Sequence, residues 1–125
     1  MIKNILLIGL GGGIGSIARY FCQKWIAENT QHPFPWGTFV VNIAGCFLIG
    51  IIYTIAERTT VLAPQIRLLL ITGFCGGFTT FSTFAFENMS LLRNGDMTYM
   101  LLYTLASVVL GIAAVFAGIG LIKIL

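Results

Sequence analysis

Four long apolar stretches divide this chain, at about residues 3–26, 36–56, 66–92 and 98–124. Each has the roughly 20 residues that a helix needs to cross the hydrocarbon core of a bilayer. Inside lipid a segment must satisfy its own backbone hydrogen bonds, which favours helices over single strands. The sequence therefore predicts an all-α integral membrane protein, with four transmembrane helices in one domain (residues 1–125) and both termini on the same side.

Composition agrees with a membrane protein. Of the 125 residues, 58% are apolar and only 9% are charged, whereas a soluble domain has about a quarter of its residues charged. A secretory signal is the alternative for the first stretch, because Lys3 precedes an apolar run. That run continues past Arg19, however, and is longer than a signal core, so we interpret it as a retained helix.

The basic residues divide almost evenly between the two predicted sides of the membrane. Those on the side of the termini are Lys3, Arg58, Arg67 and Lys123, and those on the other side are Arg19, Lys24 and Arg93. Orientation follows the excess of Lys and Arg on the cytoplasmic side, so a weak bias allows the chain to insert both ways. The count is compatible with a dual-topology antiparallel homodimer, or with one orientation set by Lys3 and its neighbours.

Polar chemistry is concentrated in the third stretch. The pair Gly76-Gly77 falls in mid-membrane, where two glycines weaken a helix, so we expect a break there, near residues 75–79. Non-helical backbone at this depth is tolerated only where protein or a cavity covers it. Carbonyl groups freed at such a break can coordinate a cation. The break therefore predicts an ion site.

Two side-chain stripes follow the break if the chain continues as a helix. They are Phe81, Phe84 and Asn88 on one face, and Thr80, Thr83 and Glu87 on the next. Aromatic ring edges are the positive part of the ring quadrupole and can meet an anion, while hydroxyl groups donate hydrogen bonds. The competing interpretation is that Phe81 and Phe84 only pack in the core.

Two further polar residues lie within the first two stretches. Asn42 offers amide N–H donors that can replace water around an anion, or it joins helices by a hydrogen bond. Arg19 lies near the far end of the first stretch, where it either extends its charge to the headgroups or forms a basic mouth that concentrates anions.

Several other classes of protein fit the sequence less well. It has no nucleophile and base set and no paired carboxylates, and its three cysteines are isolated, so we expect neither an enzyme nor a nucleic-acid partner. A small dual-topology multidrug exporter relies on a carboxylate in its first helix, and none precedes Glu28 here. A structural or assembly protein of the membrane does not require the glycine pair, Asn42 and the Thr/Ser run together.

Three motifs carry a family resemblance: GGGIGSIARY at residues 11–20, GTFVVN at 37–42 and GFCGGFTTFSTF at 73–84. In this order and spacing they resemble the hallmark segments of the Fluc (CrcB) fluoride channels, and the match spans nearly the whole chain. The resemblance implies an antiparallel, dual-topology homodimer with two pores, each built from both subunits. It also implies a bacterial inner-membrane location, with fluoride, membrane lipids and a second copy of the chain as partners.

The resemblance further implies roles for individual residues. Phe81 and Phe84 would be pore phenylalanines, Asn42 the pore-lining amide, and Arg19 part of an anion vestibule. The remaining polar lining, assigned by position, is Thr38, Thr83, Glu87, Tyr103 and Ser107. A structural Na⁺ at the dimer centre would be held by the backbone carbonyls of Gly76 and Thr79 from both subunits. The implied function is passive export of F⁻, which relieves fluoride toxicity.

Overall fold

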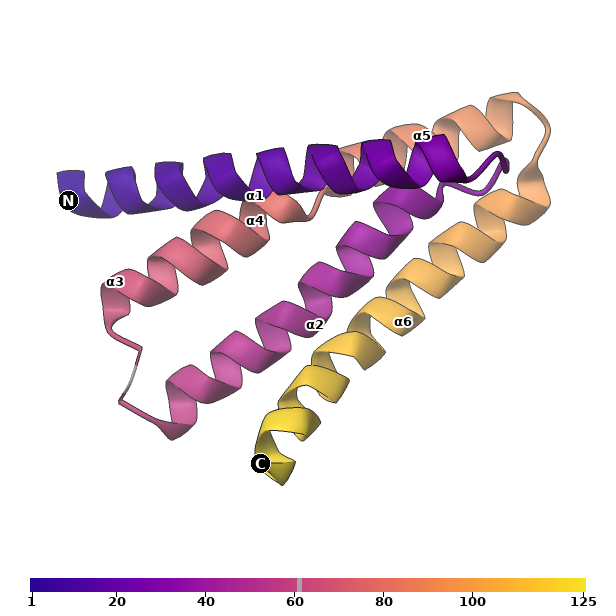
Figure 1. Cartoon of the computed structure of the whole chain (residues 1–125). Coiled ribbons are helices and arrows are strands. Elements are labelled where there is room, and N and C mark those ends of the chain that lie inside the picture. Colours follow the sequence, from indigo (N-terminus) through magenta and orange to yellow (C-terminus); the bar gives the residue numbers. More distant parts are fainter. Residues whose placement is uncertain (61) are drawn as a thin grey trace.

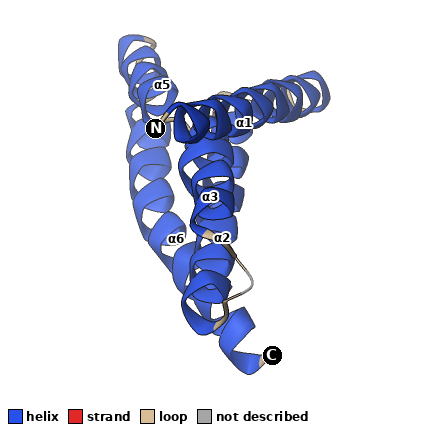
Figure 2. Cartoon of the chain, turned by 90° about the vertical axis from the view of Figure 1, so that its left-hand side faces the viewer, coloured by secondary structure: helices blue, strands red, loops and turns tan. Residues whose placement is uncertain are grey.

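The computed structural model describes residues 1–60 and 62–125, and within them every regular element is a helix (Figure 2). The elements are α1 (Ile2–Asn29), α2 (Trp36–Arg58), α3 (Pro64–Arg67), the π-helix η1 (Leu68–Cys75), α4 (Gly76–Phe78), α5 (Phe81–Arg93) and α6 (Met97–Ile124). Together they give four stretches long and apolar enough to cross a membrane, the third of which is Pro64–Arg93. The prediction of an all-α, four-span membrane protein is confirmed.

The four stretches alternate in direction (Figure 1). The connections from α1 to α2 and from α5 to α6 lie at one end of the molecule. Both termini and the connection from α2 to α3 lie toward the other end. Two helix pairs make the main contacts: α1 packs along η1 and α4, and α2 packs along α6. The pairs diverge toward the end that carries the termini, which gives the molecule a splayed shape (Figure 1).

Glycines allow α1 to approach the third stretch closely. A Cβ added to Gly11 would lie 3.0 Å from the Cα of Gly73, and one added to Gly77 would lie 3.0 Å from the Cα of Gly12. Packing between helices in lipid favours small residues for this reason. The face of α1 that carries Gly11 and Gly15 therefore packs against the face of the third stretch that carries Gly73 and Gly77.

The break in the third stretch lies after the glycine pair and not at it. Gly76 and Gly77 are helical in α4, whereas Thr79 (φ −92°, ψ 158°) and Thr80 (φ −150°, ψ 121°) are extended. The predicted position at Gly76-Gly77 is therefore wrong, although the wider range 75–79 reaches the first extended residue. Gly77 allows the backbone of α4 to pack closely against Gly12. The helix ends before Thr80, whose backbone N–H and carbonyl are hydrogen-bonded to the side chain of Asn42.

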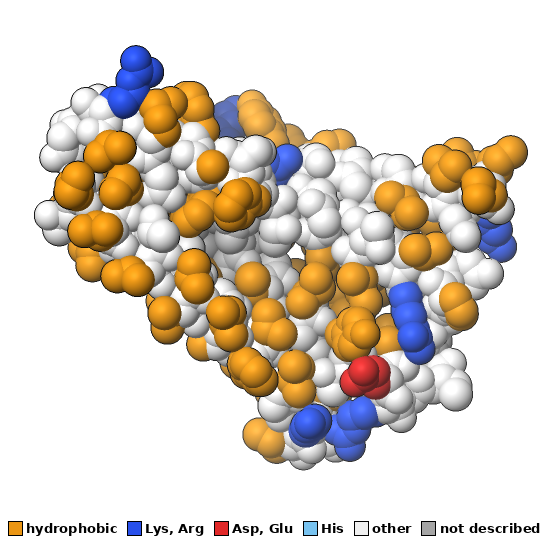
Figure 3. All heavy atoms as spheres, turned by 180° about the vertical axis from the view of Figure 1, so that it is seen from behind, with side chains coloured by type: hydrophobic (Ala, Val, Ile, Leu, Met, Phe, Trp, Pro, Cys, Tyr) orange, Lys and Arg blue, Asp and Glu red, His pale blue; other side chains and the backbone are white. Residues whose placement is uncertain are grey.

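Large apolar side chains cover much of the surface (Figure 3). The buried cluster is small and lies toward the connection end, where Phe34, Leu91 and Tyr103 pack with Phe39 and Phe84 among the partly buried neighbours. A surface this apolar is suited to lipid and to partner helices. The polar groups in the interior are therefore few, and their partners define the candidate site.

Candidate functional site

The amide of Asn42 on α2 holds the break in the third stretch. Its Nδ2 donates to the carbonyl oxygen of Thr80 at 3.1 Å, and the backbone N–H of Thr80 donates to its Oδ1 at 2.8 Å. The Thr80 hydroxyl in turn accepts the N–H of Thr83 at 3.2 Å and caps the start of α5. Polar backbone in lipid must find such partners. Asn42 is thus occupied by the backbone, with one N–H left over.

The same bonds release two carbonyl groups from the helical pattern. In an unbroken helix the carbonyl of Gly76 accepts the N–H of Thr80, and the carbonyl of Thr79 accepts the N–H of Thr83. Here Thr80 donates to Asn42, and Thr83 donates to the Thr80 hydroxyl. Gly76 is also exposed on the surface of the molecule. The two carbonyls expected from the resemblance to hold a cation are among those that lose their helical donors at the break.

Arg19 lies beside the break, away from the end of its helix. Its Nε donates to the carbonyl oxygen of Gly77 at 3.1 Å, so a cation sits at the C-terminal end of α4, where helix carbonyls are unpaired. The expected position near the end of the helix is therefore wrong, because the guanidinium is drawn to these carbonyls, whereas its role in an anion vestibule stays a prediction. Because Arg19 lies at the break, it is not counted with either side of the membrane. Four basic residues then remain on the side of the termini and two on the other side. This difference no longer supports dual topology by itself.

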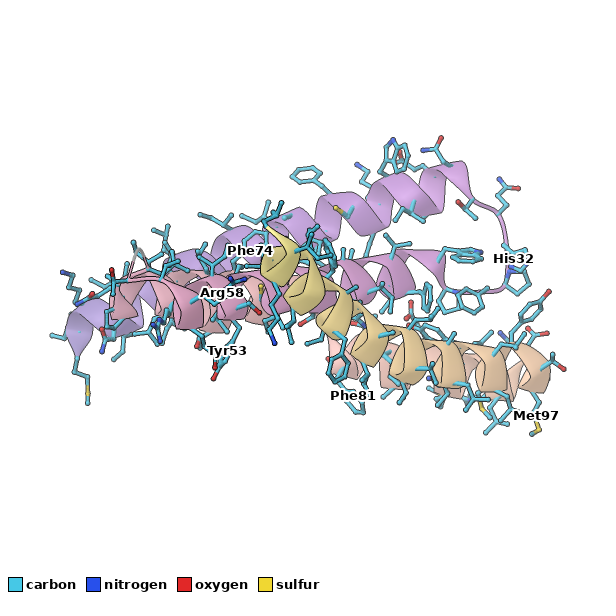
Figure 4. All side chains as sticks on the ribbon, turned by 90° about the horizontal axis from the view of Figure 1, so that it is seen from below. His32, Tyr53, Arg58, Phe74, Phe81 and Met97 are labelled. Atoms are coloured by element: carbon cyan, nitrogen blue, oxygen red, sulfur yellow. The ribbon has the colours of Figure 1, made fainter. Side chains whose placement is uncertain are left out.

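The phenylalanine stripe of α5 faces a cavity of about 300 Å³. Asn42, Thr79, Thr80, Phe81, Phe84 and Ser107 all line it. The rings of Phe81 and Phe84 lie 5.6 Å apart, and Phe81 is 79% exposed and projects from the ribbon (Figure 4). Ser107 Oγ is the one buried side-chain polar atom without a hydrogen-bond partner in residues 1–60 and 62–125. An unpaired hydroxyl therefore shares the lining of one cavity with two aromatic rings and an amide.

Thr83 and Glu87 of the hydroxyl stripe line a second cavity, of about 340 Å³, toward the connection between α1 and α2. At its wall the carboxylate of Glu87 accepts two hydroxyl groups, one from Thr38 at 2.9 Å (Oε2) and one from Tyr103 at 2.8 Å (Oε1). The Thr83 hydroxyl accepts a hydrogen bond from Thr80 at 3.1 Å, which leaves its own hydrogen to donate. Three of the five residues expected by position line this cavity, namely Thr38, Thr83 and Glu87, and a fourth, Tyr103, is bound to Glu87.

Sequence reasoning missed several residues of this second cavity, including two whose side chains make hydrogen bonds. Gln23 donates its Nε2 to the Thr38 hydroxyl at 3.0 Å, and the available signal was an amide inside an apolar span. His32 also lines the cavity, and its Nδ1 accepts the backbone N–H of Phe34 at 3.1 Å. It lies in the connection between α1 and α2, which had no motif to mark it (Figure 4).

Known proteins are similar in sequence to this chain over nearly its whole length. The family described as "CrcB-like protein, Camphor Resistance (CrcB)" matches residues 6–119. This chain belongs to the CrcB family. The match includes the break, both cavities and Arg19. It confirms the family to which the three motifs point.

Individual CrcB relatives align almost end to end with this chain. It is 50% identical over 118 residues to a protein of Phocaeicola vulgatus (94% of this chain, 97% of the relative), and 48% identical over 121 residues to one of Leptospira interrogans (97% and 95%). A protein of Chlorobaculum tepidum is 48% identical over 124 residues (99% and 98%). All three are named "Fluoride-specific ion channel FluC". Conduction by an ion channel is not an enzymatic function.

Proposed function

We propose that this chain is a fluoride-selective channel that conducts F⁻ passively across the membrane. The observation that carries the proposal is the aromatic cavity, where the unpaired Ser107 hydroxyl lies with Asn42 and the rings of Phe81 and Phe84. Fluoride is small and strongly hydrated, so its passage requires donors that compensate for lost water. A buried hydroxyl, an amide N–H and ring edges are such donors. The names of the aligned relatives support the same ion.

The two cavities would form successive parts of one path. On the polar side, the free hydrogen of Thr83 is a donor, while the hydroxyls of Thr38 and Tyr103 are committed to Glu87. Arg19 supplies a fixed positive charge beside the break, which raises the local concentration of anions. A path that offers isolated donors in narrow apolar surroundings favours fluoride over the larger chloride.

A second copy of the chain would complete the path and cover the break. Phe81 is 79% exposed, and Gly76 presents a carbonyl without its helical donor at the subunit surface. In lipid such a carbonyl must be covered by protein or satisfied by a ligand. A homodimer that joins two breaks brings the carbonyls of Gly76 and Thr79 together from both subunits. Hard cations such as Na⁺ prefer oxygen ligands, so a structural Na⁺ fits this set.

We further propose that the two subunits are antiparallel, with two pores, in a bacterial inner membrane. The support is the resemblance of the three sequence motifs to the family. Outside the cell, acid converts fluoride to neutral HF, which crosses the membrane and dissociates inside. A negative-inside potential then drives F⁻ out through the channel. The proposed role is resistance to fluoride.

Fluoride release from liposomes tests the proposal. The full chain is reconstituted in vesicles loaded with KF or KCl, valinomycin is added, and an ion-selective electrode records the anion. We expect fast F⁻ release with little Cl⁻. Phe81→Ile should slow F⁻ release about three- to tenfold, because each aromatic contact contributes about 0.5–1.5 kcal/mol.

Phe86→Ile is the matched control, since Phe86 is 62% exposed on the same helix but does not line the cavity. Equal loss in both variants would point to a structural effect. Absence of F⁻ release from folded wild-type protein would overturn the channel.

A further inference from the structure

We propose that Gln23 is a positioning residue of the polar cavity, whose amide directs the hydroxyl hydrogen of Thr38 toward Glu87. This inference rests on the proposed fluoride channel and deepens it. It adds a second residue of α1, after Arg19, to the residues that the sequence analysis assigns to the path. Gln23 acts through Thr38 and needs no contact with the ion.

The chain of donors has a fixed direction. Gln23 Nε2 donates to Thr38 Oγ1 at 3.0 Å, and Thr38 Oγ1 donates to Glu87 Oε2 at 2.9 Å. An amide nitrogen only donates, so Thr38 accepts from it and keeps one hydrogen to give. That hydrogen goes to a carboxylate oxygen. Without Gln23 the hydroxyl could rotate and offer its hydrogen elsewhere.

A close helix approach puts Gln23 in reach of Thr38. A Cβ added to Gly37, the residue before Thr38, would lie 3.3 Å from the Cα of Gln23 and 3.5 Å from its Cβ. Contacts of 3.0–3.4 Å are tighter than most that real Cβ atoms make. Gly37 therefore lets the backbone of α1 lie directly against the start of α2. The geometry is specific to this pair of positions.

The orientation of Thr38 determines which hydrogen-bond donors of the polar cavity are available to an ion. Gln23, Thr38, Thr83 and Glu87 line the same cavity. With Thr38 and Tyr103 both committed, the carboxylate of Glu87 is held at both oxygens, and of these three hydroxyl groups Thr83 is the one that keeps a hydrogen to donate to an anion. Gln23 thereby keeps the negative group restrained while one hydroxyl stays available. A rotating Thr38 would release one side of Glu87 into the path of the ion.

Gln23→Met removes the donor at similar size and tests the role. We expect the rate of F⁻ release to fall about fivefold, the change that loss of one neutral hydrogen bond typically causes. Gln65→Met is the matched control, because Gln65 is exposed at the start of the third stretch and lines neither cavity. The control should release F⁻ at the wild-type rate.

A double-mutant cycle separates positioning from general damage. Thr38→Val removes the hydroxyl through which Gln23 acts, so adding Gln23→Met to Thr38→Val should cause no further loss. A structural defect would instead reduce the rate by the same factor in both backgrounds. Additive losses would therefore overturn the inference, and so would a Gln23→Met protein that releases F⁻ like the wild type.

The wild-type protein in the same experiment distinguishes the two proposals. Normal wild-type release with an unchanged Gln23→Met rejects the positioning role and leaves the channel intact, whereas no wild-type release rejects both. If Gln23→Met does not elute as folded protein, Gly37→Ala replaces it. Gly37→Ala should separate Gln23 from Thr38 and produce the same loss in the wild-type background but none in Thr38→Val. Equal losses in both backgrounds would overturn the inference.

Discussion

Asn42 and Thr80 exchange two hydrogen bonds across the helix interface, a side-chain amide against a backbone peptide group, at 3.1 and 2.8 Å. The amide thus supplies to Thr80 the donor and acceptor that a neighbouring helical turn would otherwise supply. Because both bonds come from one side chain, the extended backbone at Thr79 and Thr80 depends on a single residue of α2. An amide that looks like an ion ligand in the sequence is first of all a structural partner.

Asn42→Asp tests that dependence. A carboxylate still accepts the N–H of Thr80 but cannot donate to its carbonyl, which leaves a partly buried acceptor without this donor and places a negative charge beside it. We expect a loss of about 1–3 kcal/mol in stability and a large drop in F⁻ release. Thermal unfolding in detergent, followed by tryptophan fluorescence, measures the first, with the exposed Asn4→Asp as control. Unchanged unfolding would contradict the structural role.

Tyr103→Phe removes one of the two hydroxyls on Glu87. Tyr103 is fully buried and its hydroxyl lies 2.8 Å from Glu87 Oε1, so the change leaves a carboxylate with a single side-chain donor. We expect a loss of about 1.5–3 kcal/mol in stability, the range for hydrogen bonds to charged groups. Tyr53→Phe, at a residue that is 56% exposed, should have no such effect. Chemical unfolding of both variants checks the difference, and equal stability would contradict the contact.

Gly15→Ala should separate α1 from the third stretch. A Cβ at this position would lie 2.9 Å from the backbone nitrogen of Phe78, and backbone cannot move aside as a flexible side chain can. We expect about 1–3 kcal/mol of destabilisation from overpacking. Gly120→Ala on α6 is the control, because nothing lies within 4 Å of its added Cβ. Thermal unfolding of both variants measures the effect, and Gly15→Ala should have the lower melting temperature. The reverse order would reject the interface.

Sodium should stabilise the proposed dimer. If the carbonyls of Gly76 and Thr79 hold Na⁺ between subunits, replacing Na⁺ by N-methylglucamine during purification should shift the protein toward monomer. Saturating Na⁺ at 100 times its dissociation constant would contribute about 2.7 kcal/mol. Thr79→Ser should keep the dependence, because backbone supplies the ligand. Light scattering after size-exclusion chromatography measures the oligomer, and a dimer indifferent to Na⁺ would argue against the site.

The architecture was predictable, whereas the details of the site were not. Hydropathy alone locates the four spans, because lipid imposes length and helicity. The position of the break was missed, because the glycine pair has a second use in packing against Gly12, and only the partner of Thr80 marks where the helix ends. Arg19 and Gln23 were misplaced or overlooked for a similar reason. Their partners, Gly77 and Thr38, lie on other helices, and periodicity within one helix cannot reveal contacts between helices.

The break in Pro64–Arg93 is held largely from outside that stretch, by Asn42 of α2 and Arg19 of α1. On its own in lipid, the stretch would have to close its backbone bonds internally and would form an uninterrupted helix. Both supporting helices precede it in the chain, so they are synthesised first and are present when it enters the bilayer. The order of the helices along the polypeptide is therefore also an order of biogenesis. We expect a circular permutant that begins at Pro64 to insert this stretch as an unbroken helix. The break should form only after α1 and α2, which follow it in the permutant, have been inserted.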